Sequence, residues 1–460
     1  MAVQVRAPGH PSAARFPPGP KPSLRTMLIY APGSDPLAFF TNLARTYGDV
    51  AYLRMGGEHL FLLSDPRHIR DVLVTHQRSF VKGRGLERAK RLLGNGLLTS
   101  EGATHLRQRR LIQPAFHRDR IASYATVMTG CADRVRTRWA DGSDLDVAQE
   151  MMRLTLAIVG KTLFDTDVEA RARDVGDAMT AVMESFWTFM LPFARIIERL
   201  PVPGLRRSRA ARAELDAIIY RMIAERRRSP GDRGDLLSML LEAQDEERND
   251  GPHERAMTDQ QVRDEAMTIF LAGHETTANV LTWTWYLLSG APDVEARLHA
   301  EIDRVLGGRL PTVADIGSLP FVEQVVTESM RLYPPAWMIG RRAIEPYPID
   351  DYVLPRRALV LLSPYIVQRD ARHFREPDRF LPDRWTAELK ASLPPFAYLP
   401  FGGGPRRCIG ESFAWMELVL VLSTIAQRWR LRLVPGHPVV PQASVTLRTK
   451  HGMKMTAIAR

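Results

Sequence analysis

Residues 401–410, Phe-Gly-Gly-Gly-Pro-Arg-Arg-Cys-Ile-Gly, constrain this chain more than any other segment. Their glycines let the backbone pass close to a flat group without side-chain clashes, and Pro405 stiffens the loop. The apolar run that follows predicts a helix that begins near Cys408 and reaches about residue 430, with its free N–H groups aimed at the sulfur. Such N–H groups favour the thiolate, which is the form that binds metal. The segment fits a thiolate ligand to iron; a buried cysteine in an ordinary glycine-rich turn is the alternative.

The composition excludes several classes of protein. Of 460 residues, 45% are hydrophobic and 25% are charged, which is typical of a globular protein. Two cysteines, Cys131 and Cys408, cannot build a disulfide scaffold, so a reducing compartment is the simpler interpretation. The net charge is +11, but no nucleic-acid motif accompanies it, and we expect no nucleic-acid partner. The charge is then either solvated arginine or a surface that attracts an acidic protein.

Neither the N-terminus nor the longest apolar run of the chain has the pattern of a membrane anchor. Residues 1–21 are rich in Pro, Ala and Gly, which predicts a flexible tail without the apolar core of a signal peptide. The longest apolar run, residues 266–288, contains His274, Glu275 and Asn279. Ionisable groups at mid-span favour a buried functional helix over a transmembrane anchor. We therefore expect a cytoplasmic protein.

The periodicity of the chain predicts a mainly α fold of the α+β class. Residues 50–55 and 59–63 are typical of two strands joined by a hairpin, and helical patterns dominate from residue 66 to about residue 306. Thr258 and Gln261 predict a capping box that opens a long helix. Without a shift in composition to divide it, the chain is predicted to be one large helix-rich domain over residues 22–460, with small peripheral β-sheets.

Later segments add shorter elements. A helix from about residue 319 should end at Leu332, because two prolines follow at 334 and 335. Strands are then expected at residues 359–362 and near residues 445–447.

Residues 272–277, Ala-Gly-His-Glu-Thr-Thr, interrupt the apolar run in the middle of the long helix. Burying an acid and two hydroxyls is costly unless they are satisfied. A threonine can bond back to a carbonyl one turn earlier, and Gly273 removes a side chain where a ligand could approach. The segment predicts a small polar niche for dioxygen and water, with a kinked core helix as the alternative.

The glycine-rich segment resembles the haem-binding loop of the cytochrome P450 superfamily, whose pattern is Phe-x-x-Gly-x-Arg-x-Cys-x-Gly. The fixed positions are met by Phe401, Gly404, Arg406, Cys408 and Gly410. The resemblance extends over about residues 22–455 and implies the cytochrome P450 fold. It also implies haem b (iron protoporphyrin IX) as cofactor, with Cys408 as the axial thiolate and metal ligand.

By the same resemblance, residues 272–277 match the superfamily's oxygen-activation segment. Thr276 would hold the bound oxygen through a hydrogen bond, and Glu275 would pass protons toward it. Beyond Cys408 and Arg406, the residues then expected to contact the haem are Phe401, Gly402, Gly410, Ala272 and Gly273.

Two charged groups are also implied by the resemblance. Glu328 and Arg331 match the characteristic Glu-x-x-Arg, and Arg379 lies in a matching Pro-x-Arg-Phe segment; the three would brace the cysteine loop. The haem propionates would be held by Arg406, Arg341, and His105 with Arg109. His105 replaces the tryptophan usual in the family, and Arg342 could exchange roles with Arg341.

The basic residues expected on the cysteine side of the haem fit an acidic electron carrier, a ferredoxin or flavodoxin with its reductase. They are Arg107, Arg109, Arg110, Arg406 and Arg407. A solvated basic face is the alternative interpretation.

The family resemblance places a lipophilic substrate pocket at the apolar residues Phe186, Trp187, Phe189, Phe193, Trp337, Met338 and Ile339. It predicts a monooxygenase that inserts one atom of dioxygen into a terpenoid, carotenoid or fatty-acid-like molecule by hydroxylation or epoxidation. A haem-thiolate isomerase, dehydratase or peroxygenase is the rival enzyme. A non-catalytic haem sensor is the rival of another class, and it would need an output module that the sequence does not contain.

Overall fold

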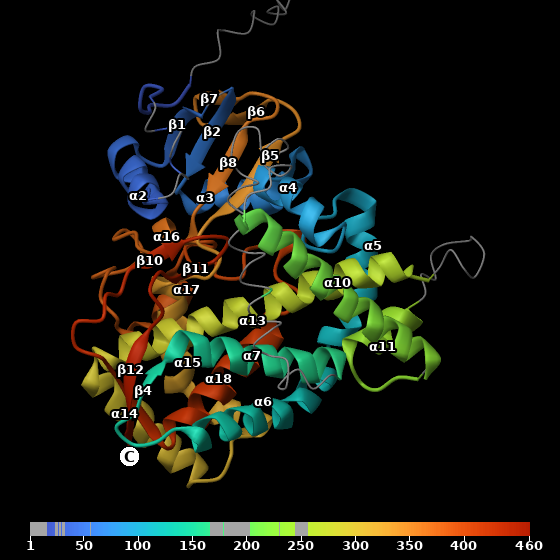
Figure 1. Cartoon of the computed structure of the whole chain (residues 1–460). Coiled ribbons are helices and arrows are strands. Elements are labelled where there is room, and N and C mark those ends of the chain that lie inside the picture. Colours follow the sequence, from blue (N-terminus) through green and yellow to red (C-terminus); the bar gives the residue numbers. More distant parts are fainter. Residues whose placement is uncertain are drawn as a thin grey trace, which may run out of the picture.

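The computed structural model describes residues 16–23, 26, 29, 33–55, 57–165, 178, 203–229, 231–243 and 256–460. A small β-rich layer lies at the top of Figure 1, and a larger body of helices lies below it. The mainly α architecture with small sheets that the sequence predicts is therefore confirmed.

The largest sheet has five strands in the order β1-β2-β8-β5-β3. Their bounds are β1 Val50–Met55, β2 Glu58–Leu63, β8 Leu359–Leu362, β5 Ile339–Ala343 and β3 Phe80–Lys82. The predicted hairpin is confirmed as β1 and β2, which pair antiparallel. Strand β2 then pairs in parallel with β8, so the sheet joins segments from opposite ends of the chain. Pairing of β3 with β5 sets Lys82 opposite Arg341, which brings two cations together.

Three smaller sheets lie at the periphery of the described fold. One has three strands: β4 Asp144–Asp146, β12 Lys454–Ala459 and β9 Trp429–Leu433. The others are two-stranded: β10 Pro441–Ala443 with β11 Leu447–Thr449, and β6 Tyr347–Ile349 with β7 Tyr352–Leu354.

The described α-helices are α2 Pro36–Tyr47, α3 Pro66–Arg70, α4 Arg84–Leu93, α5 Gly102–Ile112, α6 Arg118–Arg138, α7 Val147–Phe164, α10 Pro203–Arg228, α11 Leu236–Glu242, α13 Asp259–Ser289, α14 Pro292–Leu306, α15 Pro320–Leu332, α16 Pro364–Val367, α17 Ala387–Ser392 and α18 Glu411–Ala426. The capping box at Thr258 and the end of α15 at Leu332 are confirmed. The helix after Cys408 is shorter than predicted, since α18 ends at Ala426 and β9 begins at Trp429.

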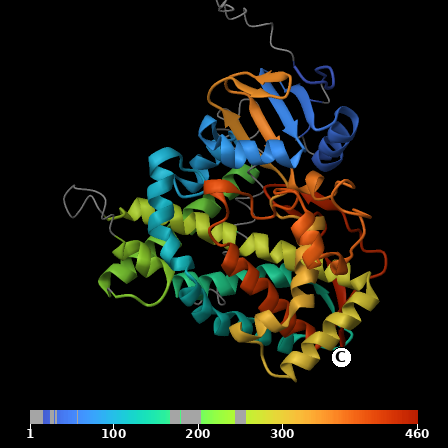
Figure 2. The same cartoon turned by 180° about the vertical axis from the view of Figure 1, so that it is seen from behind.

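Helix α13 forms the axis of the helical body. It contacts α7, α10, α15 and α18, and the view from behind shows α18 passing close to it (Figure 2). Two fully buried tryptophans, Trp283 and Trp285, anchor it in the core. The indole N–H of Trp283 donates to the carbonyl of Leu447 at 3.1 Å, and its ring stacks on Tyr333 with centroids 4.0 Å apart. These contacts fix the helix that carries the acid–hydroxyl segment.

The first described residues pack along β1. The Phe16 ring stacks on Tyr52 with centroids 4.7 Å apart, and the Tyr52 N–H donates to the Pro18 carbonyl at 3.0 Å. The expected boundary between a tail of residues 1–21 and the domain stays a prediction.

His299 is a buried titratable group in α14. It is 2% exposed, and neither ring nitrogen has a hydrogen-bond partner among the described residues. Burial lowers its pKa from an ordinary 6.5 to about 3, and Arg460 and Arg430 also disfavour its protonation. As the pH falls below 6.5, the unfolded chain takes up a proton that the folded chain refuses. His299 therefore makes the folded state less stable as the pH falls from about 6.5 toward 3.

His299→Leu should flatten this pH dependence. The loss of unfolding free energy between pH 7 and pH 5, measured by urea unfolding, should shrink by about 1–2 kcal/mol. The exposed His451 provides the control, because His451→Leu should leave the slope unchanged. An unaltered slope in His299→Leu would contradict the assignment.

Candidate active site

The cysteine loop lies between β-rich and helical parts of the fold and leads into α18. The N–H of Cys408 donates to the carbonyl of Phe401 at 3.0 Å, which closes the loop on itself. Gly402 and Gly404 have φ values of 70° and 68°, which side chains rarely adopt. A Cβ at Gly404 would lie 2.0 Å from the carbonyl oxygen of Leu73. Gly404 is therefore required by a close backbone approach to Leu73.

Opposing effects set the pKa of the Cys408 thiol. The residue is exposed, yet protein surrounds it closely enough that burial raises its pKa above the ordinary value. The Gly410 N–H, Arg109 and Arg407 act in the opposite direction, and Glu411 adds to the rise. The Gly410 N–H thus favours the thiolate as the sequence predicts, but burial outweighs it. A bound metal cation supplies the missing positive charge, because a coordinating thiol loses its proton outright.

The second cysteine is unsuited to a ligand role. Cys131 is buried inside α6 within the main hydrophobic core, and its sulfur accepts a hydrogen bond from Arg134 at 3.2 Å. Of the two cysteines, Cys408 alone is exposed.

One face of α13 is accessible where the flanking turns are buried. Ala272 is exposed, and Gly273 and Thr276 are half-buried, whereas residues 262–271 are buried. The Thr276 hydroxyl donates to the Ala272 carbonyl at 2.7 Å, which confirms the predicted back-bonding. A Cβ at Gly273 would lie 3.0 Å from Val159, so that glycine serves helix packing. Ala272 and Thr276 thus share an accessible face, one helical turn apart.

Glu275 is turned about 100° around α13 from Thr276 and is buried. It is 3% exposed, and one of its oxygens accepts a hydrogen bond from the Thr446 hydroxyl at 2.6 Å. Asn279 donates to the same hydroxyl at 3.1 Å. Burial raises the pKa of Glu275, which favours the protonated acid. The acid and hydroxyl are therefore adjacent in sequence but face different surroundings, because successive helical residues diverge by 100°.

Cationic side chains gather beside the cysteine loop. Arg341, His105 and Lys82 are all buried, and Arg406 donates to Glu101 at 2.5 Å. Burial lowers the pKa of Arg341 to about 10, with repulsion from Arg406 in the same direction. Together with Arg109, which also acts on His105, these residues form the cationic cluster: Lys82, His105, Arg109, Arg341 and Arg406.

Mutual repulsion is strong within this cluster. Burial lowers the pKa of His105 to about 4, and Lys82, Arg406, Arg109 and Arg341 all add to the effect. Burying like charges together is unfavourable unless an anion accompanies them. Their chemistry fits the two carboxylates of a haem, with arginines suited to pair with each carboxylate. The predicted residues His105, Arg109, Arg341 and Arg406 are thus brought together, since all interact with His105.

Arg341 and Arg342 do not exchange roles in this structure. Arg342 lies 3.6 Å from both Glu58 and Glu87. Arg341 faces the cationic cluster instead, as the alternation of side chains along β5 requires.

The predicted brace exists, with one member different. Glu328 and Arg331 are fully buried, and two guanidinium nitrogens of Arg331 donate to the carboxylate at 2.8 Å each. Arg384 donates to Glu328 at 2.9 Å, and so does the Trp385 indole. The predicted third member, Arg379, is wrong: its guanidinium is largely exposed and pairs with Glu376. Arg379 contributes only its backbone carbonyl, which accepts from Arg331 at 3.1 Å.

The brace reaches the cysteine loop through Gln368. Arg331 donates to the Gln368 carbonyl at 2.8 Å, and the Gln368 amide donates to the carbonyls of Met330 and Arg331 at 3.0 Å each. The Gln368 side-chain oxygen accepts from the Leu399 N–H at 3.0 Å. Leu399 lies two residues before Phe401, so the network fixes where the loop begins.

The predicted pocket residues fall into three groups. Trp337 is 4% exposed, packs in the core beside Phe40 and donates to the Ser444 carbonyl at 2.8 Å, so its pocket role is wrong. Met338 and Ile339 are half-buried, and a Cβ at Gly402 would lie 3.8 Å from Ile339. Residues 186, 187, 189 and 193 lie outside the described residues.

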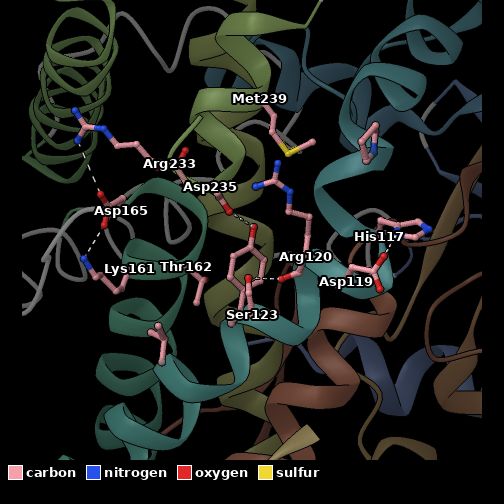
Figure 3. Close-up of a pocket in the computed structure, with 14 residues that line it drawn as sticks. His117, Asp119, Arg120, Ser123, Lys161, Thr162, Asp165, Arg233, Asp235 and Met239 are labelled. Carbon is pink, nitrogen blue, oxygen red and sulfur yellow. Dashed lines mark hydrogen bonds and ion pairs between the residues drawn. The ribbon is translucent and has the colours of Figure 1, made fainter. Parts of the chain in front are cut away.

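A separate polar cleft of about 780 Å³ lies between the starts of α6 and α11 and the end of α7 (Figure 3). Its lining is dominated by charges that are already paired. Asp165 lies 2.6 Å from Lys161 and 3.9 Å from Arg233, and Tyr124 donates to Gly234 at 3.1 Å. Lined with ion pairs and lacking Cys408 in its walls, the cleft does not suit a lipophilic substrate.

Of the basic residues predicted beside Cys408, some point into the protein and others are exposed. Arg406 turns inward to Glu101. Arg407 pairs with Glu411 at 2.5 Å, and Arg109 donates to the Arg407 carbonyl at 2.8 Å. Arg110 and Arg407 are exposed.

Sequence reasoning missed Lys82, Glu101, Arg384 and Thr446. The sequence contains a weak indication that Arg384 could pair with Glu328, since it lies five residues after Arg379 in the same irregular segment. Lys82 and Thr446 reach the site through strand pairing and through a C-terminal segment, and no local pattern marks them.

Comparison with known proteins places the chain in a family. The family profile described as Cytochrome P450 matches residues 16–455 of the chain. The chain is 41% identical to cyclooctatin synthase of Streptomyces melanosporofaciens over 432 residues, 94% of this chain and 92% of the relative. It is 38% identical to cyclooctat-9-en-7-ol 5-monooxygenase of the same organism, over 93% and 92% of the two chains. For pentalenene oxygenase of Streptomyces avermitilis the identity is 36%, over 92% and 93%. The solved cytochrome P450DA heme domain superposes with a TM-score of 0.87 at 28% identity, over 98% and 99%.

The chain therefore belongs to the cytochrome P450 family. It is a monooxygenase that binds haem b through an axial cysteine thiolate, as predicted. A P450 monooxygenase of this kind uses a lipophilic substrate and a redox partner. Within the described parts of the chain, no helix is long and apolar enough to cross a membrane.

The corrected brace can be tested with a matched pair of arginines. Arg384→Ala should lower the free energy of unfolding by about 3 kcal/mol, because it leaves Glu328 buried with one charge partner fewer. Arg379→Ala should change it little, since the Arg379 side chain is exposed. Urea unfolding of both variants measures the difference. Equal losses, or a larger loss for Arg379→Ala, would contradict the network described above.

Proposed function

We propose that this cytochrome P450 inserts one oxygen atom into a terpenoid. The observation that carries the proposal is the similarity, at 36–38% identity over nearly the full length of both chains, to cyclooctat-9-en-7-ol 5-monooxygenase and pentalenene oxygenase, whose names denote oxygenation of terpenoids. Cyclooctatin synthase, at 41% identity, is named for a related product. Met338 and Ile339 are half-buried, and Ile339 lies beside Gly402 of the cysteine loop, which supports an apolar binding surface there.

In this proposal Cys408 is the axial ligand and α13 supplies the opposite wall of the haem site. Bound haem activates dioxygen. The exposed Ala272 would keep α13 thin where the cofactor and oxygen lie, and Gly273, half-buried beside it, lets the helix pack close to Val159. The Thr276 hydroxyl, which donates to the Ala272 carbonyl in this structure, would turn to donate a hydrogen bond to oxygen. The neighbouring Glu275, whose pKa is raised by burial, would supply protons. Arg109, Arg341 and Arg406 would neutralise the propionates, and His105 would donate a hydrogen bond to one of them. Phe401, Gly402 and Gly410 would line the haem site from the cysteine loop.

The redox partner in this proposal is an acidic ferredoxin or flavodoxin with its reductase. Arg407 is exposed in the cysteine loop, and the exposed Arg110 follows Arg109, which donates to the Arg407 carbonyl. Positive charge there would steer an acidic protein. The cytoplasm supplies such carriers and is the proposed location.

A ligand screen tests the substrate class. Binding is followed through the haem Soret band with pentalenene, cyclooctat-9-en-7-ol, a carotenoid and a fatty acid as probes. A terpenoid should give the largest shift, and turnover under ¹⁸O₂ should place one labelled atom in the product. Binding of the fatty acid alone would contradict the terpenoid class. A product without label, or turnover that needs no electrons, would instead support an isomerase, dehydratase or peroxygenase.

The role of the Thr276 hydroxyl can be tested with Thr276→Val, which keeps the side-chain shape. Without the donor, reduced oxygen should leave as hydrogen peroxide, so product formed per NADPH consumed should fall by about tenfold. Thr282→Val is the control, because Thr282 back-bonds to Ala278 within the core at 2.7 Å. An unchanged ratio of product to NADPH in Thr276→Val would exclude the hydroxyl from this role.

Charge reversal at Arg110 tests the docking surface. Arg110→Glu should raise the KM for a reduced acidic ferredoxin several-fold at low salt, and the difference should vanish near 0.5 M salt because screening removes it. The largely exposed Arg375 offers the control Arg375→Glu. A KM that does not change at low salt would exclude Arg110 from the docking surface.

A further inference from the structure

Lys82 is the member of the cationic cluster that neither the sequence nor the family resemblance assigns. It ends β3, pairs with Arg341 of β5, and is 7% exposed. Its backbone N–H donates to Glu101, the same carboxylate that binds Arg406. The lysine thus lies beside two of the arginines proposed to hold the propionates.

The Lys82 ammonium has three N–H donors, and two of them have partners among the described residues. Two of its N–H groups donate at 2.7 Å to the carbonyls of Leu97 and Ser100. An ammonium has three donors and no acceptor. The third donor has no partner within the described part of the chain. A buried donor of this kind calls for an acceptor, since leaving it unpaired is costly.

The surrounding charge makes that acceptor an anion. Burial lowers the pKa of Lys82 to about 7; attraction to Glu101 acts in the opposite direction, and repulsion from Arg406, Arg341 and Lys90 adds to the lowering. The cluster carries more positive than negative charge before the cofactor is counted. A carboxylate would both neutralise it and accept the third hydrogen bond.

Lys82 also holds the segment that precedes α5. Glu265 accepts a hydrogen bond from the Leu97 N–H at 2.8 Å, and Asp264 accepts from Asn95 at 2.7 Å. Residues 95–100 are thereby fixed from α13 on one side and from Lys82 on the other. Leu98 in the middle of this segment is 36% exposed.

We propose that the Lys82 ammonium donates its third hydrogen bond to a haem propionate and so ties the edge of the cofactor to residues 97–100. The inference deepens the proposed site and rests on the propionate role of the cationic cluster. It makes Lys82 a cofactor-binding residue that also positions a segment beside the haem. Loss of the propionate charge then loosens residues 97–100, because the carbonyls of Leu97 and Ser100 accept hydrogen bonds from the Lys82 ammonium.

Haem dissociation measures the propionate contact without any turnover. Wild type and Lys82→Met are loaded with haem b or with haem dimethyl ester, which lacks free carboxylates, and haem loss to excess apomyoglobin is followed by absorbance. Lys82→Met should release haem b at least about tenfold faster than wild type. Release of the dimethyl ester should differ less than about twofold between the two proteins. The exposed Lys390 gives the control Lys390→Met, which should alter neither rate.

The possible outcomes separate this inference from the proposed site. Equal acceleration of both haems by Lys82→Met would overturn the inference, because the lysine would then act only through the fold. If wild type itself retained both haems equally, the whole propionate assignment of the cluster would fail. Should Lys82→Met not fold, Lys82→Gln keeps a donor for Leu97 and Ser100 but carries no charge, and the same ratio is expected.

Hydrogen exchange tests the link to residues 97–100. In wild type, the amides of Thr99 and Ser100 should exchange several-fold faster with haem dimethyl ester than with haem b. In Lys82→Gln the two haems should give equal exchange. Exchange in wild type that does not depend on the haem carboxylates would contradict the link.

Discussion

The fold depends on one buried carboxylate, Glu328. A fully buried charge is tolerable only when it is paired and fully hydrogen-bonded, and Arg331, Arg384 and Trp385 meet that demand. These partners come from α15 and from the irregular segment after residue 375, which has little regular structure of its own. The carboxylate therefore fixes the path of a segment that propensity alone would leave undetermined.

That path determines the geometry of the cysteine loop. Arg331 holds Gln368, Gln368 holds Leu399, and the loop closes when Cys408 donates to Phe401. Each step is a hydrogen bond in or near the core, where losing a partner costs most. The loop thus receives its position from a network that is separate from the chemistry of the sulfur. Positioning by a rigid shell is what a metal ligand requires.

A second constraint is the excess of positive charge on the other side of the loop. Burial, together with repulsion from Arg406, lowers the pKa of His105, Arg341 and Lys82. Such a cluster favours a dianionic ligand and rejects a neutral one. The same lysine that takes part in it also holds residues 97–100. Cofactor charge and the shape of a neighbouring segment are therefore physically linked.

The sequence alone determined the class of fold, the haem-binding loop, the long helix with its capping box, and the Glu328–Arg331 pair, because each is written in residues close together in the chain. It placed Thr276 and Glu275 side by side, but only the helix geometry separated their side chains. It chose Arg379 where Arg384 binds Glu328, since both arginines stand in one irregular segment with no period to distinguish them. Only the pairing of β3 with β5 places Lys82 beside Arg341. Contacts between distant segments depend on which backbone carbonyls and charges meet in space, and that was decided by the tertiary structure.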